Sequence, residues 1–94
     1  MVTSPFQTTI GTTPVQAVSS HEKRTALGIA NLHSTAMVYY STDPGVTTSS
    51  GFPIFPKTVR DLNIGLGDDP TRSIYVVSDT VSTTIAISEQ YKGA

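Results

Sequence analysis

The chain has 94 residues, and its 6 Lys or Arg against 7 Asp or Glu give a formal net charge of -1. This length predicts one domain with a small core, and the near-zero charge disfavours a nucleic-acid binder, which needs clustered Lys and Arg. The sequence has no apolar run of about 18 residues, so we expect no membrane span. It also has no cysteine, which makes oligomerisation a natural way to stabilise so small a domain.

Residues with β-branched side chains dominate the composition. Thr, Val and Ile account for 31 of the 94 residues, whereas helix formers such as Leu and Ala are scarce. β-Branched side chains are stiff at χ1 and suit a pleated, half-buried surface. The high Ser and Thr content is also compatible with disorder, but the apolar residues alternate in several separate runs, which favours an all-β fold.

The N-terminal part of the chain is extended in character. Residues 1–14 are uncharged and rich in Thr, with prolines at positions 5 and 14. This composition predicts an extended N-terminal arm or a first edge strand, followed by a single β domain over residues 15–94. Within that domain, Val15 to Val18 alternates apolar and polar residues and indicates a short strand, and the polar residues 19–24 predict a loop.

Residues 25–31 fit two structures. Ser19 and Glu22 have capping-box spacing, so a helix could follow them. The alternating pattern instead places every second residue from Thr25 to Asn31 on one face of a strand. We expect the strand, because the apolar stripe is too short for a stable helix.

The middle of the chain combines a strand, a turn and a segment broken by proline. Residues 36–41 predict a strand in which Val38 and Tyr40 share one face. Residues 42–45, Thr-Asp-Pro-Gly, predict a turn, and residues 46–50 are expected to be extended. Residues 51–56 contain two prolines, so this segment cannot be a central strand.

The C-terminal third predicts three further strands. Residues 58–64 have the mixed pattern of a half-exposed strand, residues 65–70 predict a turn or loop, and residues 74–77 predict a buried strand. Residues 83–88 alternate regularly and predict the last strand. Six or seven short strands separated by turns predict an all-β fold, a compact antiparallel β-sandwich or jelly-roll-like barrel with an extended N-terminal arm.

No residue pattern predicts catalytic, metal or cofactor chemistry. His21 and His33 are twelve apart and lack metal-ligand spacing, so we interpret them as solvated loop residues. No GxSxG elbow supports a Ser-His-Asp triad, and the Gly65 to Asp69 segment lacks the residues of a phosphate or calcium loop. We therefore predict no catalytic, metal-binding or cofactor-binding residue and no enzymatic activity.

The candidates for an interface are large apolar or aromatic residues of the N-terminal segment, of the strand predicted at residues 36–41 and of residues 52–55. Residues 52–55 admit two interpretations, a loop that closes one end of the barrel or an apolar surface that docks on another subunit. The N-terminal segment contributes apolar residues spaced by four, which we interpret as anchors on an extended strand. The candidate interface residues are Val2, Phe6, Ile10, Tyr40, Phe52, Ile54 and Phe55.

Several short motifs occur in a characteristic order along the chain. They are Gly-Thr-Thr-Pro at 11–14, Arg24 followed by Leu-Gly-Ile-Ala-Asn at 27–31, Val-Tyr-Tyr at 38–40, Val-Thr-Thr-Ser-Ser-Gly-Phe-Pro-Ile at 46–54, Ile-Tyr-Val-Val-Ser at 74–78 and a last strand that closes in Glu89. In this order the chain resembles the small all-β virion proteins encoded beside the head genes of tailed bacteriophages, which carry GTTP, R-x-x-L-x-I-x-N, V-Y-I-G and V-T-T-S-x-G-x-P-L motifs. The sequence departs from that pattern at Tyr40-Ser41 and in a longer charged loop at 65–72.

The resemblance implies a structural and non-enzymatic role in a virion. The expected role is a capsid decoration or cement protein that is made in the bacterial cytoplasm and binds the outside of the phage shell. Its expected partners are the major capsid protein and other copies of itself, with a trimer as the first expectation. The alternatives are a neck or tail component and a virion-displayed adhesion or carbohydrate-binding module, which outward-facing tyrosines in a concave patch would favour.

Overall fold

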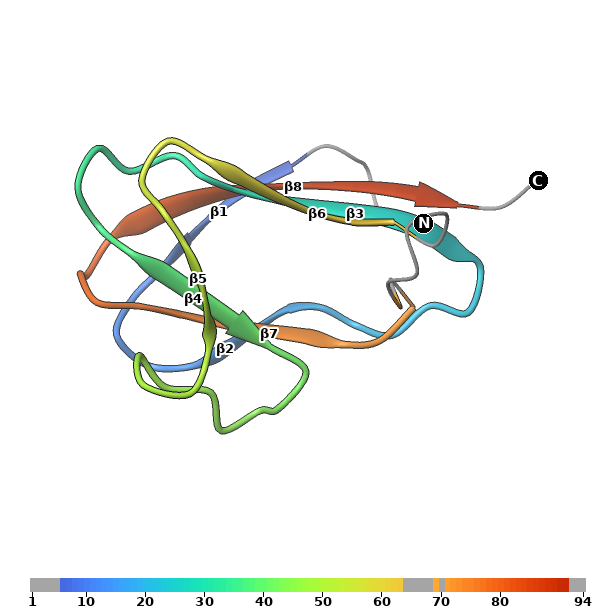
Figure 1. Cartoon of the computed structure of the whole chain (residues 1–94), viewed down its shortest axis with the longest axis horizontal. Coiled ribbons are helices and arrows are strands. Elements are labelled where there is room, and N and C mark those ends of the chain that lie inside the picture. The colour runs from blue at the N-terminus through green and yellow to red at the C-terminus, as the bar shows by residue number, and fades with distance from the viewer. Residues whose placement is uncertain (1–5, 64–68, 70, 92–94) are drawn as a thin grey trace.

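Eight β-strands form two four-stranded antiparallel sheets in the computed structural model, which describes residues 6–63, 69 and 71–91 (Figure 1). No helix occurs among these residues, so the helical alternative for residues 25–31 is wrong. The all-β prediction is confirmed. The strands are β1 (Phe6–Ile10), β2 (Val15–Val18), β3 (Arg24–Asn31), β4 (Val38–Ser41), β5 (Phe52–Ile54), β6 (Val59–Asn63), β7 (Ile74–Ser78) and β8 (Thr83–Tyr91).

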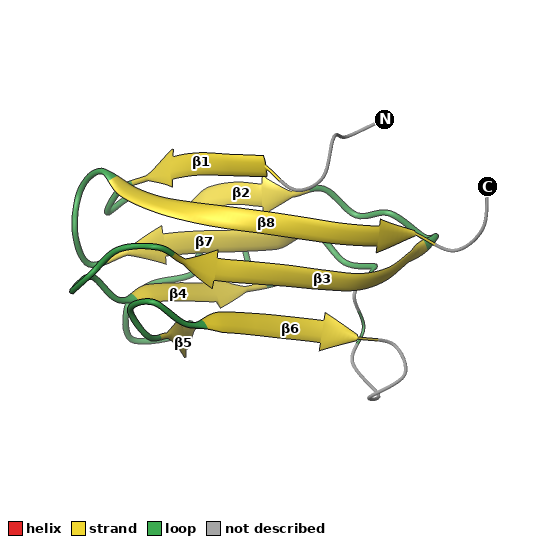
Figure 2. Ribbon diagram, turned by 90° about the horizontal axis from the view of Figure 1, so that it is seen from above, coloured by secondary structure: helices red, strands yellow, loops and turns green. Residues whose placement is uncertain are grey.

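The strand order shows how the chain winds between the two sheets. One sheet, sheet A, has the order β1-β8-β3-β6, and the other, sheet B, has the order β2-β7-β4-β5 (Figure 2). Strands pair as β1 with β8, β2 with β7, β3 with β6 and β4 with β5, as in one long hairpin folded at the β4–β5 turn. Further pairing of β3 with β8 and of β4 with β7 completes each sheet.

The core lies between the sheets and is built from the alternating apolar residues. In β3, Leu27 and Ile29 are buried while Ala26 and Ala30 are half-buried, as the period of two predicts. The last strand alternates in the same way. The residues of the core cluster are Ile10, Val18, Leu27, Ile29, Val38, Ile54, Leu62, Ile74, Val76, Ile85 and Ile87.

A second, smaller apolar contact lies on the outer face of sheet B. Val77 points away from the main core yet is buried, and Val46 in the loop after β4 is also buried. A Cβ atom on Gly51 would lie 2.6 Å from Tyr39 Cβ and 2.7 Å from Val46 Cγ2, so the loop packs tightly against β4. The loop therefore covers part of the outer face of sheet B.

The expectation of an extended segment at residues 46–50 is wrong. The amides of Ser50 and Gly51 both donate to the Thr47 carbonyl oxygen, at 3.2 and 2.9 Å. The Ser50 hydroxyl accepts the Thr47 amide at 2.9 Å. This turn replaces an extended backbone because it lets Val46 reach the sheet while hydroxyl groups satisfy the turn's amides.

Two proline-dependent predictions are confirmed. The Val46 amide donates to the Asp43 carbonyl oxygen at 3.1 Å, so Pro44 occupies the second position of a turn. Strand β5, which contains Pro53, pairs only with β4 and lies at the edge of sheet B.

The N-terminal segment belongs at least in part to the fold. Within residues 1–14, Phe6–Ile10 forms strand β1 at the edge of sheet A, which pairs with β8 from the Phe6–Ile87 pair to the Ile10–Thr83 pair. Residues 1–5 lie outside the described residues, and most of the expected loop at 65–70 does as well.

Candidate functional site

Three side chains join the two sheets on the side of the molecule where β5 ends sheet B and β6 ends sheet A (Figure 2). The Arg60 Nε atom, from β6, donates a hydrogen bond of 2.8 Å to the Tyr40 hydroxyl of β4. The Arg60 guanidinium carbon lies 5.0 Å from the centroid of the Phe52 ring, within the range of a cation–π interaction. The Tyr40 and Phe52 rings are tilted at 50° with centroids 5.6 Å apart, which is a favourable aromatic geometry.

Exposed apolar side chains follow along the same stretch of chain. Phe52 is 54% exposed, Phe55 is 59% exposed and Val59 is 57% exposed. We call these three residues, with Tyr40 and Arg60, the β5–β6 edge. Two exposed phenylalanines on a free sheet edge form a surface suited to another protein, because burying them removes apolar area from water.

The candidate interface residues differ in how far the fold buries them. Phe52 and Phe55 are exposed, and the half-buried Tyr40 contacts Phe52. Ile10 and Ile54 are 4% and 2% exposed and belong to the main core, so we remove them from the candidate interface. Their alternation within β1 and β5 turns them inward.

The two remaining N-terminal candidates have different outcomes. Phe6 is half-buried and packs against the core, so its ring serves the fold at the end of β1. Val2 lies outside the described residues.

An ion pair is buried at one end of the sandwich, and the sequence interpretation missed it. Arg24 Nη1 lies 2.9 Å from Glu89 Oε1, with side-chain exposures of 1% and 2%. The same guanidinium donates to the carbonyl oxygens of Ser19 and Arg72 at 2.9 Å. Arg24 therefore ties the loop before β3 and the segment before β7 to β8, and it is not the isolated basic residue that its place in a polar run suggests.

A second buried polar residue occupies the opposite end of β3. The Asn31 Nδ2 group donates to the carbonyl oxygens of Ala36 at 2.7 Å and Ile54 at 3.0 Å. Its Oδ1 atom accepts the His33 amide at 3.0 Å. Because Asn31 is in sheet A and Ile54 is in sheet B, this side chain fastens the two sheets together.

The two histidines hold loop backbone in place. The Nδ1 atom of His33 accepts the amides of Thr35 at 3.0 Å and Ala36 at 2.9 Å. His33 lies in the loop after β3 and is half-buried, so it remains partly in contact with solvent. His21 is exposed, and its Nδ1 atom accepts the Lys23 amide at 3.2 Å.

One small pocket brings a histidine near a carboxylate, an arrangement that a hydrolase would need. His21, Arg24 and Glu89 all line this pocket. The Glu89 carboxylate accepts from Arg24, and His21 Nδ1 accepts a backbone amide. Both groups thus take part in contacts that hold the fold together.

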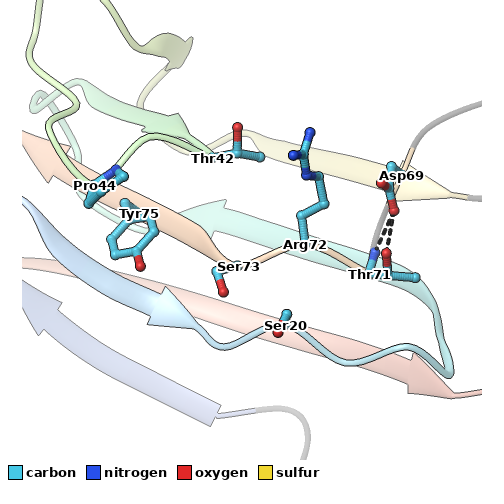
Figure 3. Close-up of a pocket in the computed structure, with 8 residues that line it drawn as sticks. All are labelled: Ser20, Thr42, Pro44, Asp69, Thr71, Arg72, Ser73 and Tyr75. Atoms are coloured by element: carbon cyan, nitrogen blue, oxygen red, sulfur yellow. Dashed lines mark hydrogen bonds between the residues drawn. The ribbon is translucent and has the colours of Figure 1, made fainter.

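A polar hollow lies on the outer face of sheet B (Figure 3). Tyr75 of β7 lines it, between the cross-strand neighbours Gln16 of β2 and Ser41 of β4. Arg72 and Asp69 contribute one positive and one negative charge to the lining. Hydrogen bonds from the Thr71 hydroxyl and amide to the Asp69 carboxylate lower the pKa of Asp69, and the charge of Arg72 lowers it further.

Within residues 6–63, 69 and 71–91, no group of three or more His, Cys, Asp or Glu residues has the geometry to hold a metal ion. The same part of the chain contains no helix long and apolar enough to cross a membrane.

Comparison of the chain with protein-family models, with curated proteins and with solved structures found no match.

Proposed function

We propose that the chain is a non-enzymatic structural protein of a tailed-bacteriophage virion, a decoration or cement protein that binds the outside of the capsid shell. The observation that carries this proposal is the β5–β6 edge, where Phe52 and Phe55 are exposed beside a free strand. Exposed aromatic residues are typical anchors of protein–protein interfaces. A free strand edge adds backbone groups that can pair with a partner.

The strand order supports a jelly-roll assignment. The orders β1-β8-β3-β6 and β2-β7-β4-β5 match a long hairpin rolled into two facing sheets, an architecture that viral capsid domains use. The same architecture also occurs in lectins and cupins, so fold alone does not determine function. The proposal therefore depends on the exposed edge together with the sequence resemblance.

The motif residues of that resemblance have clear roles in folding. Leu27 and Ile29 are in the core. Arg24 and Asn31, at the two ends of β3, are buried and make hydrogen bonds. Gly51 sits where a Cβ atom would collide with Tyr39. These residues support a shared fold with the phage proteins, whereas the exposed phenylalanines supply a surface for contact with another copy of the chain.

The proposed mechanism is linkage between binding and shell stability. A protein that binds only the assembled shell stabilises it by mass action. A homo-oligomer formed through the β5–β6 edge, with a trimer expected at local threefold positions, would bridge neighbouring capsomers, because each copy would present the same remaining surface to the shell. Multivalency would strengthen the attachment.

The test is the protein composition of purified virions from the genome that encodes this chain. We expect the chain in virions at a copy number comparable to that of the major capsid protein, and we expect particles that lack it to lose their DNA at a lower temperature. A copy number typical of a single vertex would support the neck or tail alternative. Absence from virions would overturn the proposal.

A further inference from the structure

The polar hollow on the outer face of sheet B brings together side chains from three parts of the chain (Figure 3). Tyr75 lies on the outer face of β7 and forms the floor. Thr42 and Pro44, from the turn after β4, form one wall. The segment that leads into β7 forms the other wall, with Thr71, Arg72 and Ser73. The walls come from parts of the chain about thirty positions apart, which β4–β7 pairing brings together.

The chemistry of the lining narrows the class of ligand. Five of the eight lining residues carry a hydroxyl group, namely Ser20, Thr42, Thr71, Ser73 and Tyr75. Arg72 and Asp69 have opposite charges that cancel, so the hollow does not favour an anion such as a phosphate. A lining this polar does not favour an apolar ligand either. A neutral, polyhydroxylated molecule is neither an anion nor apolar, so it fits this lining.

Several hydrogen-bonding groups of the lining are available to such a molecule, although the Thr71 hydroxyl already donates to the Asp69 carboxylate. Hydroxyls both donate and accept, and a guanidinium donates only. The hydroxyls of Ser20, Thr42 and Ser73 make no hydrogen bond to the described residues, and neither does the Arg72 guanidinium. From the part of the chain that the structure describes, the Tyr75 hydroxyl accepts only a long 3.4 Å bond from Gln16.

Tyr75 adds an apolar surface to these polar groups. Its ring is half-buried and lies on the outer face of a central strand between two neighbouring strands. Because the Tyr75 side chain is already restrained there, it loses little conformational entropy when a ligand binds. A sugar ring presents C–H groups on one face and hydroxyls around its rim, so it complements an aromatic floor with hydroxyl-bearing walls.

We propose that the hollow formed by Tyr75, Thr42, Arg72 and Ser73 binds a neutral saccharide. The C–H face of the sugar lies on the Tyr75 ring, Arg72 donates to ring or hydroxyl oxygens, and the Ser and Thr hydroxyls bond to the rim. This inference goes beyond the proposed role in the virion and does not depend on it, because the hollow belongs to the folded chain and is separate from the β5–β6 edge.

The experiment is a titration of the isotopically labelled full chain by two-dimensional NMR. The probes are glucose, galactose, N-acetylglucosamine and rhamnose, with glucuronate and inorganic phosphate as anionic comparisons. We expect at least one neutral sugar to cause saturable shifts centred on the amides of Thr42, Ser73 and Tyr75, with a dissociation constant on the order of millimolar, as is usual for so small a ligand.

Matched substitutions separate the site from the rest of the surface. Tyr75→Leu should weaken the binding of the responsive sugar by at least about tenfold, whereas Tyr75→Phe, which keeps the ring, should weaken it much less. Arg72→Met and Thr42→Val each remove a hydrogen-bonding group from the lining of the hollow and leave the core residues unchanged. Each substitution should weaken sugar binding severalfold. Thr48→Val, at an exposed Thr of the same loop, is the control and should leave binding unchanged.

Three outcomes would overturn the inference. They are the absence of saturable shifts with all four neutral sugars, shifts that centre on a different surface, and stronger responses to glucuronate or phosphate than to any neutral sugar. Because the titration uses the purified chain alone, its result is independent of whether the chain is found in virions. If Tyr75→Leu fails to fold, the Arg72 and Thr42 variants still decide the question.

Discussion

Arg24 and Glu89 lie 65 positions apart in sequence and form an ion pair that is almost completely buried. Removing the two charges from water is costly, and their mutual attraction offsets that cost only while both side chains are present. We predict that Glu89→Gln lowers the free energy of unfolding by about 3–5 kcal/mol because it leaves a buried cation without its counter-charge. Urea denaturation followed by circular dichroism measures this value.

Two comparisons make that prediction specific. The double variant Arg24→Met with Glu89→Leu should lose less stability than the sum of the single variants, because it removes both buried charges together. Lys23→Met, at the exposed neighbouring residue, should change stability by no more than about 0.5 kcal/mol. A loss below about 1 kcal/mol for Glu89→Gln would contradict the structural role of the pair.

His33 accepts two backbone amides through one ring nitrogen, in the manner of a side-chain cap. We predict that His33→Ala lowers the free energy of unfolding by about 1–2 kcal/mol, because it removes the acceptor of two amides, one of which belongs to the buried Ala36. His33→Asn places an amide oxygen near the position of Nδ1 and should recover at least half of the loss. Equal losses in the two variants, measured by thermal unfolding, would show that the hydrogen bonds do not matter.

Asp69 provides a pH-dependent prediction. Hydrogen bonds from the Thr71 hydroxyl and amide, and the nearby Arg72 charge, lower the pKa of its carboxyl group. The folded pKa therefore lies below the unfolded one, so the contribution to stability is complete above the unfolded pKa and is lost as the pH falls through the folded pKa.

A carbon-detected NMR titration of the Asp69 carboxyl measures this shift directly. We expect its midpoint to lie below the ordinary Asp value of about 3.9. Thr71→Val should raise the midpoint more than Arg72→Met does, because the Thr71 hydroxyl is the largest cause of the shift. The reverse order would mean that charge, and not hydrogen bonding, controls this carboxylate.

At the scale of elements, the loop after β4 depends on a glycine. A Cβ atom at Gly51 would lie 2.6 Å from Tyr39 Cβ and 2.7 Å from Val46 Cγ2, whereas one at Gly11 would meet nothing within 4 Å. We predict that Gly51→Ala destabilises the chain by about 1–3 kcal/mol through overpacking. Gly11→Ala is the matched control and should be neutral or stabilise by up to about 1 kcal/mol. Equal effects in chemical denaturation would contradict the tight packing of this loop.

The strands could be predicted from sequence where burial follows the period of two. In β3, β7 and β8, the Leu, Ile and Val residues of one phase are buried in the core, as the period of two predicts. They are Leu27, Ile29, Ile74, Val76, Ile85 and Ile87. The prolines likewise predict the edge position of β5, because a residue without an amide proton cannot pair on both sides. These signals are local, so a single sequence contains them.

The features that sequence analysis missed depend on non-local contacts. The period of two places Thr25 on the inward face, but an irregularity between Arg24 and Ala26 turns Arg24 inward instead. Val46 is buried only because its loop folds back over sheet B. The candidate sites show the same division. The apolar residues 52–55 predict a docking surface as one of two interpretations, whereas the hollow around Tyr75 depends on strand pairing that no local pattern specifies.

At the scale of the whole molecule, the two open sheets leave four edge strands, β1 and β6 in sheet A and β2 and β5 in sheet B. The two phenylalanines of the β5–β6 edge are more than half exposed, whereas the one phenylalanine of β1, Phe6, packs on the core. An uneven distribution of exposed aromatics favours one side of the molecule for association. A small domain without disulfides also gains stability when such a surface is covered.

We predict that the purified chain forms a homo-oligomer through the β5–β6 edge, with a trimer as the expected state. Sedimentation velocity over a wide concentration range should show an assembly larger than the 10.0 kDa chain. Phe55→Ser should weaken self-association by at least about tenfold, because an exposed aromatic anchor loses its burial. Val81→Ser removes a residue that is 66% exposed but lies outside this edge, and it should leave the association unchanged. A monomer at every concentration, or equal effects of the two substitutions, would rule out this edge as the self-association surface.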